Sequence, residues 1–284
     1  MDSPRNRRQF LQLASAGAAV SLAGIPSLGL DSAKANESAA QKVKFELGMA
    51  SYTLRKFDLD QTLEMTNRVG LKHICFKDFH LPLDSSPEQI KAVVAKVNDA
   101  GISLYGGGVI YMRNEQQVHQ GFAYAQAAGM KIIVGVPNHD LLPLVDEMVK
   151  QYDIKVAIHN HGPGDKVYPV PETAYELVKN LDPRIGLCID IGHTMRSGID
   201  PSQPAEKYAD RLHDVHIKDV SAATTRGSTV EVGRGVIDIP KFLRTLVKID
   251  YTGVVSFEYE KDENDPLPGT AESVGYVRGV LAAL

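Results

Sequence analysis

Four hydrophobic segments in the second half of the chain each lead to a side chain that can bind a metal. The residues are His159 in IKVAIHNHG, Asp190 in IGLCIDIGH, His216 in LHDVHIKD and Glu258 in GVVSFEYE. They are separated by 31, 26 and 42 residues, about one strand-and-helix unit per step. A hydrophobic run that ends in such a residue before a glycine-rich or polar loop is typical of a barrel strand that opens onto an active site. The pattern predicts a divalent metal at the mouth of a (β/α)8 TIM barrel.

Hydrophobic or β-branched runs alternate with segments of helical period throughout residues 36–284. The predicted strands are Phe45–Ala50, His73–Phe76, Ser103–Gly106, Lys131–Val134, Lys155–His159, Gly186–Asp190, Asp214–Lys218 and Val254–Glu258. The predicted helices are Asp60–Val69, Pro87–Ala100, Gln116–Ala128, Leu141–Lys150, Glu172–Asn180, Pro204–Asp210, Ile239–Lys248 and Ala271–Ala283. Eight strands and eight helices indicate a closed α/β barrel, with a doubly wound open sheet as the alternative.

Residues that are typical of helix starts and helix ends support these predicted helices. Ser86 followed by Pro87 predicts a capped helix start, because serine accepts a backbone hydrogen bond and proline suits the first helical position. Gly70, Gly101 and Gly129 each follow a predicted helix and precede the next strand by a few residues. The repeated use of one helix-to-strand turn indicates a repeated architecture.

Alternate side chains of a strand point to the same face, so the four segments can be divided into an inner and an outer set. The apolar residues between the polar ones suit packing beneath outer helices. The polar residues then point into the barrel, where they must be paired or bind something. The alternative for each one alone is a barrel-interior polar group that hydrogen bonds satisfy.

Two imidazoles and two carboxylates form a mixed nitrogen and oxygen ligand set. Such a set suits Mn²⁺, Co²⁺, Zn²⁺ or Fe²⁺ better than Ca²⁺, which prefers oxygen alone. Because the set contains no thiolate, a structural zinc knot is not expected. We therefore expect one divalent metal held by His159, Asp190, His216 and Glu258, with open positions for water or substrate oxygens.

Neighbouring polar residues are candidates for contacts with a substrate. Lys218 follows His216 by two residues and is a candidate for stabilising a developing oxyanion. His193, His161 and His139 are candidate substrate-binding residues. For His161, Lys218 and Asp219 a loop-stabilising role is an equal alternative, and His139 is as well suited to capping the next helix.

The composition sets limits on partners. The 284 residues are 43% hydrophobic and 23% charged, which suits a globular domain with one large core. A net charge of −4 argues against a nucleic-acid partner, because phosphate binding requires a basic surface. No stretch has the roughly 18 to 20 consecutive apolar residues that a membrane-spanning helix requires. Cys75 and Cys188 both fall in predicted strands, where buried free thiols are expected.

The N-terminal segment has the pattern of a targeting signal. Arg7-Arg8 within NRRQFL is typical of twin-arginine export, and the weakly apolar run Leu13–Ile25 follows it. Ala33-Lys34-Ala35 supplies a cleavage motif, with a surface amphipathic helix as the alternative reading. We therefore expect a signal peptide over residues 1–35 and a barrel domain over residues 36–284, exported to the periplasm or another extracytoplasmic space.

At these segments the chain resembles the xylose isomerase-like TIM barrels of the sugar phosphate isomerase/epimerase family, which includes ketose 3-epimerases. The resemblance covers nearly all of the expected barrel. Its most specific motifs are Asp190-x-x-His193, His216-x-Lys218-Asp219, Gly233-x-Gly235-x-Ile237-Asp238 and the strand with Glu258. The resemblance implies a Glu, an Asp, a His and a second Glu around Mn²⁺ or a similar ion. It places Asp190, His216 and Glu258 in the last three positions.

The first of the four positions departs from the family pattern. Epimerase-type members have Glu-Asn-His where this chain has His159-Asn160-His161. An imidazole can bind the metal but, once bound, cannot also carry a proton. Glu258 is then the only carboxylate base of the set, so a two-base epimerisation is disfavoured while a one-base enolisation is retained.

These features predict a metal-dependent carbohydrate enzyme. The first hypothesis is an isomerase or epimerase that enolises a sugar next to its carbonyl, with Glu258 as general base. The alternatives are a lyase or hydrolase of keto-glycosides that uses the same enolate, and a sugar-binding barrel without activity. An endonuclease of the related DNA-repair type is the least favoured, because the chain is acidic. The expected partner is a small carbohydrate, with homo-oligomerisation left open.

Overall fold

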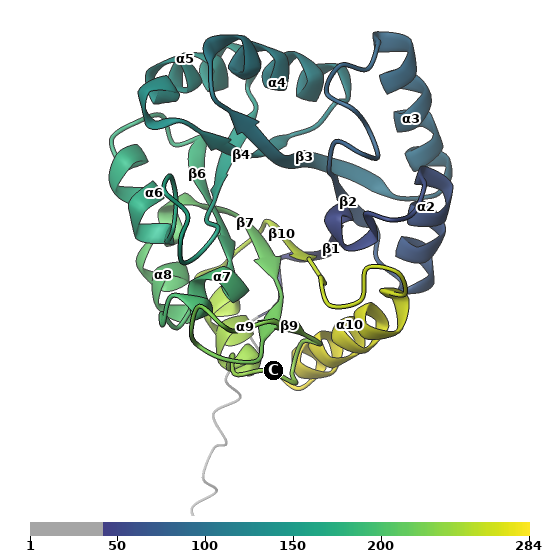
Figure 1. Cartoon of the computed structure of the whole chain (residues 1–284), viewed down its shortest axis with the longest axis vertical. Helices are drawn as coiled ribbons and strands as arrows, with labels where there is room; N and C mark the ends of the chain where they lie inside the picture. Colours follow the sequence, from purple (N-terminus) through teal and green to yellow (C-terminus); the bar gives the residue numbers. More distant parts are fainter. Residues whose placement is uncertain (1–41) are drawn as a thin grey trace, which may run out of the picture. The chain divides into compact units, whose positions relative to one another are not determined.

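Eight parallel strands close into a barrel in the computed structural model, which describes residues 42–284 (Figure 1). Their order around the barrel is β1-β10-β7-β6-β5-β4-β3-β2. The bounds are β1 Glu46–Ala50, β2 His73–Phe76, β3 Ser103–Met112, β4 Ile132–Pro137, β5 Lys155–His159, β6 Ile185–Asp190, β7 Leu212–Ile217 and β10 Val254–Phe257. Because β1 pairs with both β2 and β10, the sheet has no open edge, and the predicted closed barrel is confirmed.

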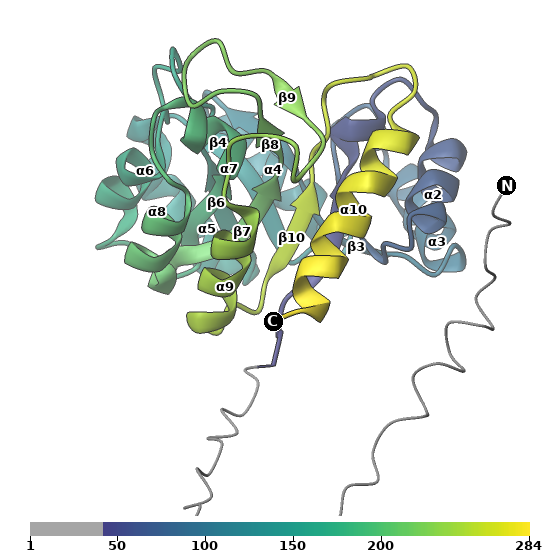
Figure 2. The same cartoon turned by 90° about the horizontal axis from the view of Figure 1, so that it is seen from below.

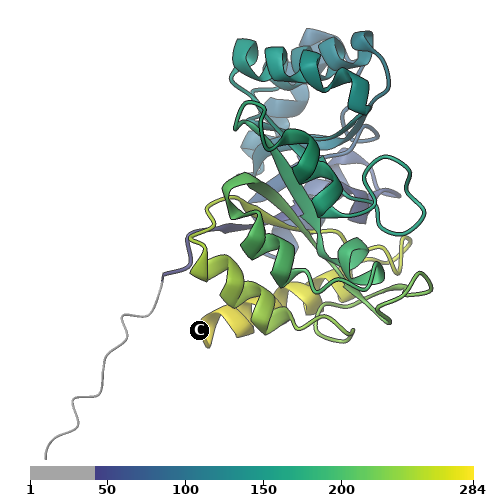
Figure 3. The ribbon, with the colours of Figure 1, turned by 90° about the vertical axis from the view of Figure 1, so that its left-hand side faces the viewer.

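Helices surround the barrel and bury their apolar sides against it (Figures 1 and 2). They are α2 Leu59–Arg68, α3 Pro87–Asp99, α4 Glu115–Ala127, α5 Leu142–Tyr152, α6 Pro171–Val178, α8 Ser202–Lys207, α9 Ile239–Lys248 and α10 Leu267–Ala282. Each corresponds to a predicted helix, with ends that differ by a few residues. Seen from the side, the same helices lie outside the strands along the barrel (Figure 3).

The residues that were predicted to begin and end helices do so in the structure. The Ser86 side chain accepts a hydrogen bond from the backbone of Gln89 at 3.3 Å, and Pro87 occupies the first turn of α3. Gly70, Gly101 and Gly129 have φ angles of 72°, 67° and 68°, which a residue with a Cβ rarely adopts. Glycine therefore ends three successive helices in the same way.

Strand β3 is longer than predicted and runs through the glycines to Met112. The reason is close packing of β3 on its neighbour β4. A Cβ added to Gly108 would lie 2.2 Å from the carbonyl oxygen of Val134, and one added to Gly106 would lie 2.7 Å from the Ile132 side chain. The glycines thus allow two strands to approach, and the longer β3 carries Tyr111 to the barrel mouth.

A short helix and a two-stranded hairpin were not predicted, and both lie beyond the carboxyl ends of strands. The short helix α7, Ile191–Arg196, begins directly after β6. Strands β8, Asp219–Val220, and β9, Thr229–Val230, form a small antiparallel hairpin after β7 (Figure 2). Both lie in connections between a strand and the next helix, and these segments have no hydrophobic periodicity from which an element could be predicted.

Other expectations concern the thiols and the termini. Cys75 and Cys188 are free and buried, as predicted. None of the helices within residues 42–284 is long and apolar enough to cross a membrane. The expected signal peptide, residues 1–35, lies outside the described residues.

Candidate metal centre

The four predicted ligands lie on four strands that are consecutive around the barrel. His159 ends β5, Asp190 ends β6, His216 lies near the end of β7 and Glu258 directly follows β10. The strand register places Asp190 beside His216. All four side chains are buried, with at most 7% of any residue exposed. The barrel therefore gathers two imidazoles and two carboxylates at its carboxyl-terminal mouth.

The ligand atoms of these four residues all lie within 4.8 Å of one another. His159 Nε2 is 3.5 Å from Asp190 Oδ2 and 3.2 Å from His216 Nδ1. His216 Nδ1 is 3.3 Å from Glu258 Oε2. Four ligands at about 2.1 Å from a tetrahedral ion are about 3.4 Å apart. The spacing of the four atoms therefore fits a single divalent ion.

The protonation of these groups also suits a cation. Burial lowers the pKa of His159 to about 4, so its imidazole is neutral near pH 7. Burial opposes a charge on His216, yet the Glu258 carboxylate next to it raises the pKa of that imidazole. Burial likewise disfavours the Asp190 carboxylate, but its interactions with His193 and with the Lys218 ammonium hold its pKa well below the usual value. The site keeps its carboxylates ionised and favours positive charge between them.

Lys218 brings a fixed positive charge to the same carboxylates. Its ammonium lies 2.6 Å from Glu258 Oε2 and 2.9 Å from Asp190 Oδ2, and it also contacts the Glu260 carboxylate. Burial disfavours this ammonium, but Asp190 and the two glutamates raise its pKa well above the usual value. Lys218, which directly follows β7, is therefore charged, buried and in contact with the predicted base.

Glu260 is a further acid of the site that was not predicted. Its carboxylate lines the same pocket and contacts Lys218. The signal was available in Glu258-Tyr259-Glu260, because residues two apart on an extended chain point the same way. Glu260 was missed because β10 was taken to end at Glu258.

A pocket of about 180 Å³ opens above the four ligands. Its lining includes two of the predicted substrate-binding residues, and the full set is Tyr52, Lys77, Val109, Tyr111, His159, His161, His193, Glu258 and Glu260. The Tyr111 hydroxyl lies 3.1 Å from His161 Nε2, and the two rings stack with centroids 5.7 Å apart. Tyr52 and Lys77 follow β1 and β2, and Tyr111 lies in the part of β3 beyond its predicted end; none of the three belongs to a repeated motif, so the sequence carried no signal for them.

The third predicted substrate-binding residue, His139, is not brought to this pocket. Its Nε2 lies 3.0 Å from the Val167 carbonyl oxygen, and its ring packs on Tyr168 with centroids 5.1 Å apart. His139 begins a short 3-10 helix, His139–Leu141, after β4. These contacts tie together two connections outside the pocket lining, so His139 supports loops rather than the site.

Asp219 has a structural role that explains a family motif. Its carboxylate accepts hydrogen bonds from the backbone of Val220 at 2.8 Å and Ile237 at 3.2 Å through one oxygen. The other oxygen accepts from Gly233 and Gly235, each at 3.0 Å. A Cβ on Gly235 would lie 2.1 Å from this carboxylate. Of the two roles considered for Asp219, the structure supports loop stabilisation.

A second set of metal-binding side chains shares both histidines but replaces the carboxylates with Cys188. Burial raises the pKa of the Cys188 thiol well above its usual value. A protonated thiol is a poor metal ligand, because metals bind the thiolate. The set with Asp190 and Glu258 is therefore the better candidate.

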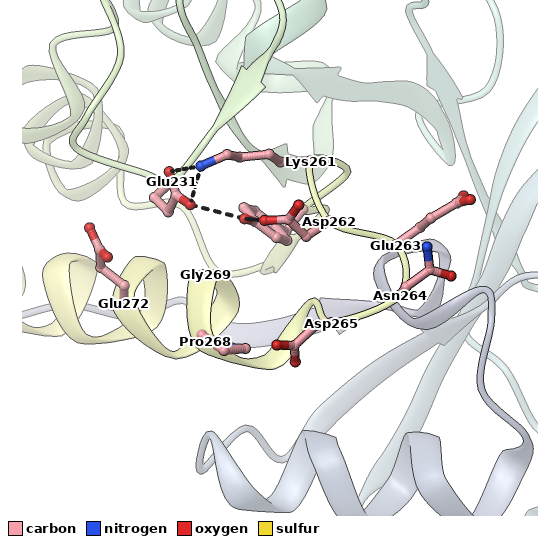
Figure 4. Close-up of a pocket in the computed structure, with 10 residues that line it drawn as sticks. Glu231, Lys261, Asp262, Glu263, Asn264, Asp265, Pro268, Gly269 and Glu272 are labelled. Carbon is pink, nitrogen blue, oxygen red and sulfur yellow. Dashed lines mark hydrogen bonds and ion pairs between the residues drawn. The ribbon is translucent and has the colours of Figure 1, made fainter.

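A larger pocket of about 540 Å³ lies beside the start of α10 and is lined mainly by acidic residues (Figure 4). Its most buried acid, Glu231, accepts hydrogen bonds from Lys261 at 2.8 Å and from the Tyr259 hydroxyl at 3.0 Å (Figure 4). Glu263 pairs with Arg55 at 3.1 Å. Glu272 pairs with Arg234, so three of the acids already have a cationic partner, and no histidine lines the pocket. Among the described residues, the candidate metal-binding groups lie at the barrel mouth and not here.

Comparison with curated proteins finds relatives over part of the chain. The rhizopine catabolism protein MocC of Rhizobium meliloti is 28% identical over 145 residues, 46% of this chain and 44% of the relative. An inosose dehydratase of Geobacillus kaustophilus is 31% identical over 129 residues, 40% of this chain and 41% of the relative. The chain thus spans less than half of the length of these two relatives.

Solved structures share the fold over most of the chain. A D-tagatose 3-epimerase-like protein has a TM-score of 0.69 at 19% identity and covers 84% of this chain and 98% of its own. The IOLI protein, solved with a bound zinc atom, has a TM-score of 0.66 at 20% identity and covers 84% of this chain and 97% of its own. The sequence profile of the xylose isomerase-like TIM barrels matches residues 113–280, more than half of the chain. The chain belongs to the xylose isomerase-like TIM barrel family.

Proposed function

We propose that this protein is a metal-dependent carbon–oxygen lyase that acts on a keto-sugar or keto-cyclitol. In this reaction a proton leaves the carbon next to the ketone, and an oxygen is then lost from the following carbon. One observation carries the proposal: the buried carboxylate of Glu258 lies in contact with the buried ammonium of Lys218, beside four converging ligand atoms. An elimination requires one base and one acid, and this pair supplies both.

His159, Asp190, His216 and Glu258 would hold the metal ion. When bound, such an ion supplies Lewis acidity, which polarises the ketone and lowers the pKa of the neighbouring C–H bond. The mixed ligand set suits Zn²⁺ and Mn²⁺ alike. The zinc atom reported with the IOLI neighbour supports a divalent ion here, and Mn²⁺ remains the sequence-based expectation.

The residues of the chain divide the proton transfers between them. Glu258 accepts the proton from carbon, and the C–H electron pair forms the new double bond as the C–O bond breaks. Lys218 donates a proton to the departing oxygen. The 2.6 Å contact between the two side chains then lets Glu258 return the proton to Lys218. His161 and His193 line the pocket, and in this proposal they bind substrate hydroxyl groups.

The site favours elimination over the isomerisation that was the first hypothesis from the sequence. Epimerisation uses two bases on opposite faces of the carbon, and His159 occupies the position of the family's first glutamate. Several relatives carry the name inosose dehydratase, which denotes loss of water from a keto-cyclitol. An isomerase or epimerase is the second candidate, supported by the fold of the D-tagatose 3-epimerase-like neighbour.

We also propose the cellular setting that the N-terminal sequence predicts. Residues 1–35 would direct twin-arginine export, and residues 36–284 would act outside the cytoplasm. Phosphorylated sugars are scarce there while glycosides are plentiful. This setting supports an unphosphorylated keto-sugar or keto-glycoside as substrate. Mass spectrometry of the N-terminus of the exported protein tests the expected cleavage after Ala35.

The reaction is tested with metal-loaded protein in D₂O. The substrates are an inosose, methyl 3-keto-β-glucopyranoside and a ketose, each followed by NMR and mass spectrometry. We expect loss of water or methanol from the first two substrates, and a loss of this activity by about 10²- to 10⁴-fold in Glu258→Gln. Glu272→Gln is a matched control, because Glu272 is an exposed residue of α10 that pairs with Arg234.

The outcomes separate the candidates. Deuterium incorporation with a changed configuration and no elimination would favour the epimerase. Absence of both exchange and elimination in protein with one bound metal would favour the sugar-binding barrel. Metal analysis of the wild type and Glu258→Gln shows whether a loss of activity reflects loss of the ion.

A further inference from the structure

A second cavity of about 130 Å³ adjoins the pocket above the ligands. Both spaces are lined by Lys77, Val109 and Tyr111, which lie at the carboxyl ends of β2 and β3. These three residues form a common wall between the two spaces. The second cavity is therefore separated from the space above the metal ligands by a single layer of side chains.

The common wall is held by specific contacts. The Lys77 ammonium donates a hydrogen bond to the Val109 carbonyl oxygen at 2.6 Å and lies 5.7 Å from the centre of the Tyr111 ring. On the site side, Tyr111 stacks on His161 and contacts its Nε2 through the hydroxyl group. Tyr111 is nevertheless 40% exposed, so its ring is accessible to a ligand.

The remaining walls of the second cavity are mostly apolar. Phe76, Ile110 and Tyr124 are at most 5% exposed, and Leu83 is half-buried. The Tyr124 hydroxyl donates its hydrogen bond to the Leu81 carbonyl oxygen at 3.0 Å, so it is already satisfied. Asp78, whose side chain is 55% exposed, borders the cavity and marks its solvent side. The cavity thus offers apolar surface and little hydrogen bonding.

Size decides which group fits. An apolar cavity of about 150 Å³ binds benzene in other proteins, so a space of this order accepts one aromatic ring. The pocket above the ligands, at about 180 Å³, is larger and lined by polar side chains, which suits one sugar ring. The two adjoining spaces therefore differ in the chemistry that each one binds.

We propose that the second cavity binds the aromatic aglycone of a keto-glycoside whose sugar ring lies above the metal ligands. The inference rests on the proposed lyase function and specifies its leaving group, a phenolic oxygen. Elimination breaks the bond between the anomeric carbon and this oxygen, and the oxygen takes the proton from Lys218. The products are an unsaturated keto-sugar and a phenol. The aglycone would pass between the Tyr111 ring and the Lys77 ammonium, which line both spaces.

The test compares ligands that differ only in the aglycone. Phenyl and methyl β-glucopyranoside, which have no ketone and cannot be eliminated, report binding by calorimetry with the metal-loaded protein. We expect the phenyl glucoside to bind about tenfold or more tightly, because one aromatic ring is buried. The corresponding 3-keto-glucosides report the same preference in kcat/KM.

Variants of Leu83, which lines the second cavity, test whether the preference for phenyl depends on this cavity. Leu83→Trp fills the space from a half-buried position and is expected to reduce the preference for phenyl to within about threefold. Leu83→Ala does not add bulk to the cavity, and it is expected to reduce the preference for phenyl because it removes apolar contact with the aromatic ring. Leu177→Trp, at an exposed position of α6, is the matched control and keeps the wild-type preference.

The result distinguishes this inference from the proposed function. Equal or undetectable binding of the two glucosides, or an unchanged preference in both Leu83 variants, overturns the aglycone site. Elimination from the methyl keto-glucoside with no phenyl preference overturns the site while the lyase function stands. A phenyl preference that depends on Leu83, in protein without lyase activity, supports the aglycone site and contradicts the proposed lyase function.

Discussion

The ammonium of Lys218 lies 2.6 Å from the carboxylate of Glu258, although the two residues are 40 positions apart in the sequence. They directly follow β7 and β10, which are neighbours in the barrel, and both residues are buried. The expected metal and this ammonium would share the same two carboxylates, Asp190 and Glu258. Lys218 therefore both neutralises these acids and opposes a second cation beside them.

Replacing Lys218 with methionine separates these two effects. Without metal, Lys218→Met is expected to lower the free energy of unfolding by about 3 to 5 kcal/mol, because it leaves buried carboxylates unpaired. Zn²⁺ should bind this variant more tightly, because the competing charge is gone. Thermal unfolding and calorimetry measure both quantities. The control Lys241→Met removes an exposed ion pair with Asp200 and should change stability by less than about 1 kcal/mol. Weaker Zn²⁺ binding in Lys218→Met would contradict the shared-carboxylate argument.

His159 can be changed to the residue that epimerase-type family members carry. His159→Glu is expected to keep metal binding, because a carboxylate replaces an imidazole at the same strand end. It would add a second carboxylate base, so exchange of substrate C–H with D₂O should rise relative to elimination. NMR in D₂O measures the ratio of the two. His159→Gln, which supplies no base, is the control and should lower both rates. An equal ratio of exchange to elimination in His159→Glu and the wild type would show that residue 159 does not determine which reaction occurs.

Asp219 should matter for stability rather than for chemistry. Asp219→Asn replaces one acceptor oxygen by an NH₂ group that faces backbone N–H donors, so the free energy of unfolding should fall by about 2 to 4 kcal/mol. Asp238→Asn is the matched control: Asp238 caps α9 through Lys241 N at 2.9 Å, and asparagine caps a helix equally well. Urea unfolding tests the pair. Similar stability of the two variants would argue against a dominant role for Asp219 in the loop.

His213 gives a pH dependence with a defined direction. Burial, together with the charge of Lys155, lowers the pKa of His213 from 6.5 to about 4 in the folded protein. As pH falls below 6.5 the unfolded chain binds the proton first, so stability is lost between pH 6.5 and 4. The loss from this residue is below about 3 kcal/mol and is reduced by partial exposure of the ring.

The variant His213→Gln isolates this effect. Glutamine retains a donor for the Pro183 carbonyl oxygen, which lies 2.9 Å from His213 Nε2. The melting temperature of the wild type should therefore fall more steeply between pH 7 and pH 4.5 than that of the variant. Parallel curves for the two proteins would show that His213 does not titrate in this range.

The sequence predicted the barrel and the four ligands because both depend on strand periodicity. In a closed barrel of parallel strands every strand ends at the same mouth, so a polar residue that ends a strand has to meet the others. His159, Asp190, His216 and Glu258 meet in this way. The periodicity of the hydrophobic runs also fixed the helices to within a few residues.

Only the tertiary structure decided which loop residues reach the pocket, because a connection has no period from which its path can be read. In the folded chain Tyr111 and Lys77 line the pocket at the barrel mouth, whereas His139 contacts the backbone of another connection. The Asp219 carboxylate accepts hydrogen bonds from backbone N–H groups of the connection that follows the hairpin. Packing likewise decided that Lys218 lies between the two carboxylates of the expected metal site. The sequence thus determined where the four ligand-bearing strands end, and the folded connections, with the longer β3, determined what surrounds those ends.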